Sequence, residues 1–158
     1  MSEPVRVVYD CMIFLQAAAR PSRVHGTMGA IADGRVSLCV SPAIIEEVRD
    51  VLNRPELRAK FPALTPGHVD AFLNDQLARA TLFFNVPPVF SLPRDPKDEP
   101  YVDLAIAANA RFLVTWNRKH LAYLMEGDTQ EGAAFCQQFP EIRIVDPPTF
   151  LAELPAVK

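Results

Sequence analysis

The chain has 158 residues, of which 49% are hydrophobic and 22% are charged, with a formal net charge of −3 at pH 7. This length suits one domain, residues 1–158, because a chain of about 150 residues buries roughly two-thirds of its unfolded surface on folding. The composition argues against a disordered chain, and the charge excludes a general attraction to nucleic acids, so a polyanionic partner needs a local basic patch.

Targeting signals and cysteines narrow the setting further. No apolar stretch approaches the length of a membrane span, and the first residues lack the basic start and apolar core of a signal peptide. The cysteines Cys11, Cys39 and Cys136 are odd in number and lack zinc-site spacing. We therefore expect a cytoplasmic protein with reduced cysteines and no membrane partner.

Five short apolar runs alternate with helical patterns along the chain. They are residues 5–9, 36–40, 82–86, 112–115 and 142–145. Continuous β-branched runs separated by helices are typical of parallel strands that are buried on both faces. The sequence therefore predicts a three-layer α/β/α fold with a central, mostly parallel sheet of four to five strands.

Proline and glycine mark the ends of several predicted helices. Ser41-Pro42 and Thr65-Pro66 each place an N-cap residue before a proline at the first helical position. Gly34 follows the expected end of a helix over residues 24–33, and residues 147–151 open a short last helix.

A carboxylate follows the first predicted strand. Asp10 lies between the run 5–9 and an apolar, helix-like segment that starts at Cys11. In parallel α/β sheets, ligands bind outside the carboxyl ends of the strands. An acid at this edge can face a metal ion, a phosphate or a ribose without being buried unpaired. Asp10 is thus the first candidate functional residue.

Two acids in the helix after the second strand compete as companions of Asp10. At about 100° per residue, Glu47 falls about 100° from the centre of the apolar stripe of this helix, whereas Glu46 falls about 160° away. Glu47 therefore flanks the buried face and leans toward the crevice in front of Asp10. The alternative is a solvated carboxylate that pairs with a residue four positions away.

A second group of acids surrounds the start of a later apolar helix. By the same step of about 100°, Asp98 lies near the centre of its apolar stripe, whereas Asp103 points about 160° away. We expect Asp98 to face the crevice and Asp103 to be solvated. Asp98 can equally serve as the N-cap of this helix, and Asp95 can cap a loop or assist.

Polar residues also follow the fourth predicted strand. Thr115 and Asn117 lie at the same carboxyl edge as Asp10. Asn117 can contribute to a site at this edge or cap a helix over residues 118–124. His120 is interpreted as a packed or hydrogen-bonded helix residue rather than a ligand.

Five short motifs follow one another along the chain. They are Val8 to Met12, Ser41 to Glu47 with Leu52 to Pro55, Asp95 to Asp98, Ala110 to Thr115, and Pro147 to Leu151. Together they resemble a PIN-domain nuclease, and specifically the bacterial toxin-type branch of that family. The chain departs from the family pattern at Cys11-Met12, where Thr-Asn is usual, and at Asn117, where an Asp is common.

The resemblance implies a metal-dependent endoribonuclease. It assigns Asp10, Glu47 and Asp98 as ligands of Mg²⁺ or Mn²⁺ and Asn117 as a further catalytic residue, with Thr115 and Asp95 as candidates for an assisting role. Clustered carboxylates raise one another's pKa, and a hard divalent cation relieves that repulsion. Because Asn117 lacks a negative charge, one tightly held ion is expected rather than two.

Cations near the acids are candidates for contacts with the RNA backbone. They are Arg94, Lys97, Arg118, Lys119 and His120, with Arg20 and Arg23 after the first helix. Each can equally be a solvated surface charge. Trp116 can stack on a nucleotide or pack at the rim of the sheet.

The toxin-type resemblance also implies partners: a small antitoxin protein that covers the acidic site, and a second copy in a homodimer. One alternative is a catalytically weakened PIN-like module that binds RNA or a partner protein without cleavage. An acid directly after the first strand is also consistent with a Rossmann-like nucleotide binder or a haloacid-type phosphatase. These classes, however, need a Gly-rich turn or a second Asp two residues later, which the chain lacks.

Overall fold

A computed structural model describes residues 3–155. Its strands form one sheet with the order β3-β2-β1-β4-β5, and every neighbouring pair is parallel. The strands are β1 (Val5–Tyr9), β2 (Val36–Val40), β3 (Thr81–Leu82), β4 (Phe112–Val114) and β5 (Arg143–Val145). The predicted α/β class with a parallel sheet of up to five strands is confirmed.

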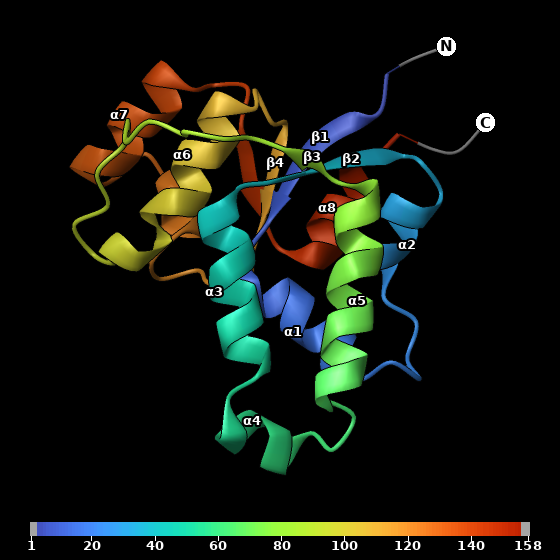
Figure 1. The fold of residues 1–158 in the computed structure, drawn as a ribbon. Helices are drawn as coiled ribbons and strands as arrows, with labels where there is room; N and C mark the ends of the chain where they lie inside the picture. Colours follow the sequence, from blue (N-terminus) through green and yellow to red (C-terminus); the bar gives the residue numbers. More distant parts are fainter. Residues whose placement is uncertain (1–2, 156–158) are drawn as a thin grey trace.

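Helices occupy the intervals between strands. They are α1 (Cys11–Ala19), α2 (Gly26–Ala32), α3 (Pro42–Leu52), α4 (Pro55–Lys60), α5 (Pro66–Arg79), α6 (Glu99–Ala107), α7 (Gln130–Gln138) and α8 (Pro147–Glu153), with 3₁₀-helices η1 (Pro96–Asp98) and η2 (Ala122–Met125). Helix α6 packs on β1, β2 and β4, while α2 and α8 pack on the sheet and on each other. Figure 1 shows α3 and α5 side by side beyond the sheet, with α4 joining their far ends.

The predicted helix ends form through local hydrogen bonds. The Ser41 hydroxyl accepts the Ile44 N–H at 3.4 Å, and the Thr65 hydroxyl accepts the His68 N–H at 3.2 Å. Gly34 has a φ of 75° just beyond α2, a left-handed conformation that glycine adopts without steric cost. These caps satisfy amide groups that the helices leave unpaired.

The central strands are buried on both faces, as continuous apolar runs predict. Val7, Val8 and Leu113 are 0% exposed. On one side of the sheet, the Phe150 ring of α8 meets the Tyr9 ring edge-on at 5.8 Å. Strands β1 and β4 pair in parallel with Tyr9 opposite Val114, so the residues that follow these strands are held close together.

Two predicted segments differ from the structure. The strand expected over 82–86 is limited to Thr81–Leu82, because Asn85 turns the chain with a φ of 57° and two prolines follow. Residues 118–124 do not form an α-helix. The amide groups of Leu121 and Ala122 both donate to the Asn117 carbonyl, which closes a turn that leads into η2.

Of the helices in residues 3–155, none is both long enough and apolar enough to cross a membrane.

Candidate active site

Asp10 lies where β1 ends and α1 begins. Its Oδ1 accepts the Ile13 N–H at 3.3 Å and so caps α1, while its Oδ2 accepts the Thr115 hydroxyl. The residue is only 6% exposed. Burial raises the pKa of this carboxyl above its usual value, although both hydrogen bonds act in the opposite direction. The result is a buried carboxylate in a fixed orientation.

Strand register brings Thr115 to Asp10. Tyr9 pairs with Val114, so the residues that follow the two parallel strands meet at the same edge. The Thr115 hydroxyl donates to Asp10 and accepts the Asn117 N–H at 2.9 Å. Thr115 therefore links the ends of β1 and β4 from a position that is 1% exposed.

Asp98 and Asn117 contact each other directly. Asp98 occupies the N-cap position of α6, but its side chain makes no capping hydrogen bond. Instead, Asn117 Nδ2 donates to Asp98 Oδ2 at 3.2 Å, and Asn117 Oδ1 accepts the His120 N–H at 3.1 Å. Asn117 thus both caps the turn that follows it and holds Asp98.

The acids share one electrostatic environment. Burial is the main cause that raises the pKa of Asp98 to about 6, and the negative charges of Asp95, Asp10 and Glu47 add to the shift. His120 acts in the opposite direction. Asp10, Glu47 and Asp98 come from three separate elements, so the fold brings together charges that repel one another.

Glu47 is half-buried on α3, and its neighbour Glu46 is exposed, which agrees with the predicted orientation of the helix. Burial raises the pKa of Glu47, while Tyr101 and then Arg54 lower it. The Tyr101 hydroxyl is buried without a partner of full hydrogen-bond geometry, but it lies close enough to the Glu47 carboxylate to affect its pKa. The sequence pattern gives no sign of this contact, because Tyr101 falls on the apolar stripe of α6.

The departure from the family pattern after Asp10 places sulfur at this site. Cys11 is half-buried, and burial together with the charges of Glu47 and Asp10 raises the pKa of its thiol to about 12. The thiol is therefore protonated at neutral pH. Met12 is 48% exposed and extends to the outer face of α1.

The acids of this site have the chemistry to bind a divalent cation, but they are not arranged as a preformed set of ligands. Within residues 3–155, no three His, Cys, Asp or Glu side chains are close enough to surround one ion. Asp10, Glu47 and Asp98 nevertheless form no ion pair with a described Lys or Arg, and the pKa of each is raised. Oxygen ligands of this kind suit Mg²⁺ or Mn²⁺. Because the side chains are not close enough to surround one ion, binding requires at least one carboxylate to rotate.

Asp103 is buried, and the prediction that it is solvated is wrong. Its Oδ1 accepts the N–H groups of Val89 and Phe90, each at 2.9 Å. Glu99 makes a similar contact with the Leu92 N–H at 2.9 Å. The segment after β3 supplies these donors, so an acid that the sequence predicts to face solvent is enclosed.

Two of the cations predicted to contact RNA have partners within the protein. The Arg94 guanidinium lies 4.0 Å from the centroid of the Tyr123 ring, and its Nε is 3.8 Å from a Glu131 oxygen. His120 Nδ1 is 3.8 Å from an Asp95 oxygen, and Asp95 also caps η1 by accepting the Lys97 N–H. These contacts favour structural roles for Arg94 and Asp95.

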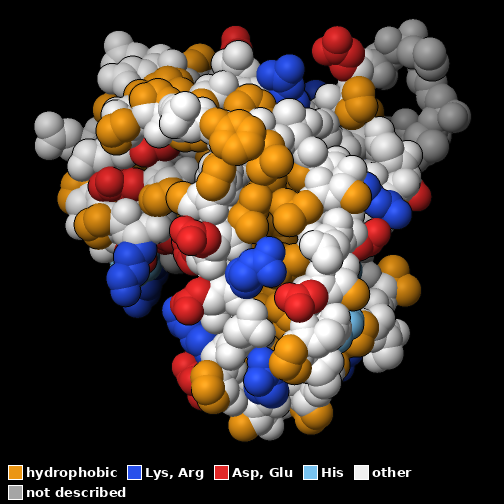
Figure 2. Space-filling model, in the orientation of Figure 1, with side chains coloured by type: hydrophobic (Ala, Val, Ile, Leu, Met, Phe, Trp, Pro, Cys, Tyr) orange, Lys and Arg blue, Asp and Glu red, His pale blue; other side chains and the backbone are white. Residues whose placement is uncertain are grey.

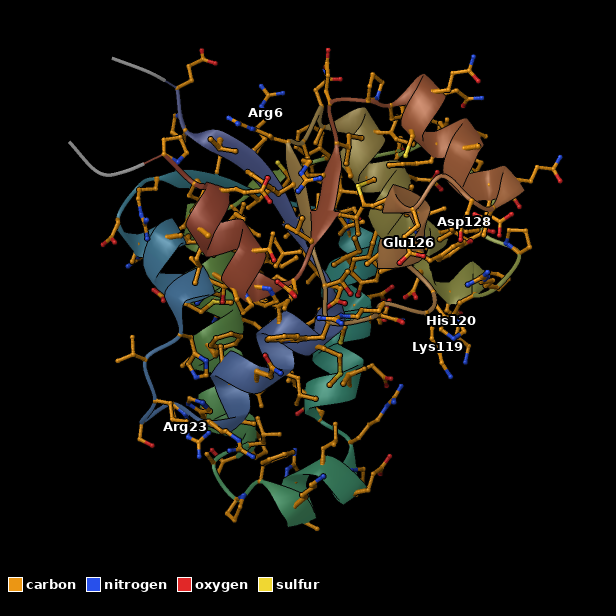
Figure 3. All side chains as sticks on the ribbon, turned by 180° about the vertical axis from the view of Figure 1, so that it is seen from behind. Arg6, Arg23, Lys119, His120, Glu126 and Asp128 are labelled. Atoms are coloured by element: carbon orange, nitrogen blue, oxygen red, sulfur yellow. The ribbon has the colours of Figure 1, made fainter. Side chains whose placement is uncertain are left out.

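Of the remaining cations near the acids, Lys97, Arg118 and Lys119 are exposed, and Arg118 also has a partner within the protein. Arg118 Nη2 lies 3.5 Å from an Asp146 oxygen, while Lys97 and Lys119 form no ion pair with a described acid. Figure 3 shows Lys119 and His120 together on one side of the molecule, away from Arg23. Lys119 and His120 therefore lie in a different region of the molecule from Arg23 (Figure 3).

The residues of this site lie within a range that matches a known protein family. A family model described as a PIN domain matches residues 6–119. The matched range contains Asp10, Glu47, Asp98, Thr115 and Asn117. No curated protein was found to match the chain.

Proposed function

The chain belongs to the PIN domain family, whose members are typically metal-dependent nucleases, and from this premise we propose that it is a metal-dependent endoribonuclease. One observation carries the proposal. The fold brings Asp10, Glu47 and Asp98 from three elements close enough for their negative charges to repel one another. No described Lys or Arg forms an ion pair with them. Such an arrangement costs stability unless it serves to bind a cation.

We assign different roles to the three acids. Asp10 has both oxygens engaged and provides the fixed carboxylate. Glu47 lies on the flank of α3 and provides the carboxylate that can rotate, while Asn117 holds Asp98 through its amide nitrogen. Mg²⁺ or Mn²⁺, when bound by these acids, supplies the Lewis acidity that lowers the pKa of water for attack on a phosphodiester. With Asn117 uncharged, one ion is proposed rather than two.

The proposed biological setting is a toxin–antitoxin pair in the cytoplasm. Here the chain is the toxin, a small antitoxin protein covers the acidic site, and two copies form a homodimer. Exposed hydrophobic side chains support protein partners. Leu82, Phe84 and Val89 are 43%, 68% and 50% exposed, and Figure 2 shows hydrophobic side chains gathered on the face that carries α3 and α5.

The second candidate function is a PIN-like module that binds RNA or a protein without cleavage. Two observations favour it: the acids are not preformed as a set of metal ligands, and Cys11 places a neutral thiol beside Asp10. Titration of Mn²⁺ by calorimetry separates the two functions. A nuclease should bind Mn²⁺ in a manner that Asp98→Asn abolishes, whereas a non-catalytic module should show no such site-dependent heat.

Cleavage of labelled single-stranded RNA, with Mn²⁺ or with EDTA, tests the nuclease directly. Helix α3 offers a matched pair of variants, because Glu47 is half-buried beside the acids and Glu46 is exposed one residue away. We expect Glu47→Gln to lower the cleavage rate by more than about 10-fold and Glu46→Gln to leave it unchanged. Equal activity of the two variants, with or without EDTA, would contradict a metal site at Glu47.

A further inference from the structure

A hollow of about 560 Å³ lies beside α1, with a lining that extends from Met12 along the helix to Arg20 and with its cations at the end away from Asp10. It is bounded by α1, the loop before α2, and α4 together with Phe61. Its polar lining consists of Gln16, Arg20, Arg23, His25 and Lys60.

The charge of this hollow has one sign. Arg20, Arg23 and Lys60 line it, no Asp or Glu does, and none of these three cations pairs with an acid among residues 3–155. Elsewhere, seven arginines of the described chain form ion pairs. A concentration of unpaired cations in a chain of net charge −3 indicates an anionic ligand.

Contacts within the hollow hold two of its three cations, Arg20 and Lys60, in place. The Arg20 guanidinium lies 5.7 Å and the Lys60 ammonium 5.5 Å from the centroid of the Phe61 ring. The His25 Nε2 donates to the Arg20 carbonyl at 2.9 Å, which ties the loop to the end of α1. Two cations over one ring form a more fixed site than isolated surface charges do, because cation–π contacts restrict their side chains.

The outer face of α1 connects the hollow to the acidic site. Met12, Gln16 and Arg20 recur every four residues and are the exposed side chains on this face. Trp116, which follows Thr115, is 44% exposed and donates from Nε1 to Gln16 Oε1 at 2.9 Å. Since a helix rises 1.5 Å per residue, the ten residues from Asp10 to Arg20 span about 15 Å.

We propose that the hollow binds the phosphodiester backbone of single-stranded RNA a few nucleotides from the bond that is cut, with the strand laid along the outer face of α1. The exposed Trp116 ring lies between the two sites and offers a stacking surface for an unpaired base. The inference rests on the proposed ribonuclease function for the place of the cut, but binding to the hollow needs no metal.

The test measures binding of a fluorescent 12-nucleotide oligouridylate in EDTA, where cleavage is prevented. The variant Arg20→Ala/Arg23→Ala/Lys60→Ala is compared with Arg49→Ala/Arg79→Ala/Arg143→Ala, which removes the same charge from exposed ion pairs elsewhere. We expect at least a 10-fold rise in Kd for the hollow variant only. Its slope of log affinity against log salt should also fall by about 0.7 for each lost contact.

Equal losses in the two variants, or no measurable binding by the wild type, would overturn the inference. If the hollow variant loses as much affinity for a 12-base-pair RNA duplex as for the oligouridylate, the assignment to single-stranded RNA is overturned. An unchanged affinity for RNA together with lost affinity for poly-glutamate would mean that the hollow binds an acidic protein instead. If the wild type binds through the hollow but does not cleave after Mn²⁺ is added, the proposed nuclease function fails and the RNA site stands.

Discussion

The two ends of α1 carry opposite charges and differ in their surroundings. At its start, Asp10 is buried near Glu47 and Asp98, and at its end, Arg20 and Arg23 are exposed beside a hollow without acids. Both ends agree with the helix dipole, which favours anions at the first turn and cations at the last. A net charge of −3 therefore conceals an acidic site and a basic site on one helix.

The two ends of α1 differ in their exposure to water and therefore in how much salt screens their charges. The acidic end is shielded from water, and this burial is the largest cause of the raised pKa values of Asp10 and Asp98, to which neighbouring carboxylates add. The basic end is exposed, so its attraction for anions is screened by salt. We therefore expect the acidic end to control the rate of reaction and the basic end to control affinity for RNA.

The largest expected effect comes from Asp10→Asn. This variant retains a side-chain oxygen that can cap α1, but it removes the charge from the buried edge of the sheet. We expect the rate of RNA cleavage to fall by more than about 100-fold, since even residues that only support metal ligands contribute 10- to 100-fold.

Binding of RNA in EDTA distinguishes this loss from an effect on the basic end. Asp10→Asn should bind the oligouridylate at least as tightly as the wild type, and its circular dichroism spectrum should be unchanged. Loss of RNA binding in this variant would mean that the two ends of α1 are not separate in function.

A smaller effect is expected from Thr115→Val, which keeps the shape of the side chain but removes the hydroxyl that donates to Asp10. Cleavage should fall by about 10- to 100-fold because the carboxylate loses its orientation. Thr27→Val, at another buried threonine, is the control for stability. Cleavage by Thr115→Val at the wild-type rate would show that Asp10 does not depend on this hydroxyl.

The smallest effect concerns pH and Asp98. Burial raises the pKa of Asp98 from its usual value of 3.8 to about 6, so between these pH values the folded protein binds a proton that the unfolded chain releases. Stability of the metal-free protein should therefore fall as pH rises through this window. Asp98→Asn should remove the part of this pH dependence that Asp98 contributes, while Asp10 and Glu47 keep theirs. It should also raise the Tm at pH 7 by about 2–4 °C, after allowance for solvent screening.

Thermal melts with and without Mn²⁺ complete this comparison. Mn²⁺ should stabilise the wild type and the Glu46→Gln control but not Asp98→Asn, because a ligand that binds only the folded state raises its stability. Identical stabilisation of all three proteins would place the metal elsewhere.

Several features of the fold follow from local sequence. The β-branched runs 5–9 and 36–40 form strands with the predicted bounds, and Ser41 and Thr65 cap helices as expected. The side chain of Glu47 is more buried than that of Glu46, because the apolar stripe of α3 sets the rotation of the helix.

Other features depend on segments that are distant in sequence. Helical periodicity predicts a solvated Asp103, but the residue is buried because the backbone of Val89 and Phe90 donates two hydrogen bonds to it. Arg94 lies beside the acids in sequence, but Tyr123 and Glu131 hold it. Helical periodicity cannot reveal either outcome, because it describes only one element at a time.

The sequence by itself determined the α/β class, the place of Asp10 at a strand end, and Glu47 as the inward-facing acid of its helix. Only the tertiary structure decided that Thr115 orients Asp10, that Asn117 holds Asp98, and that the unpaired cations Arg20, Arg23 and Lys60 line one hollow beside α1. The physical reason is the range of each interaction. Strand and helix patterns act over a few residues, whereas Thr115 and Asp10 are separated by 105 residues and meet only through the register of β1 with β4.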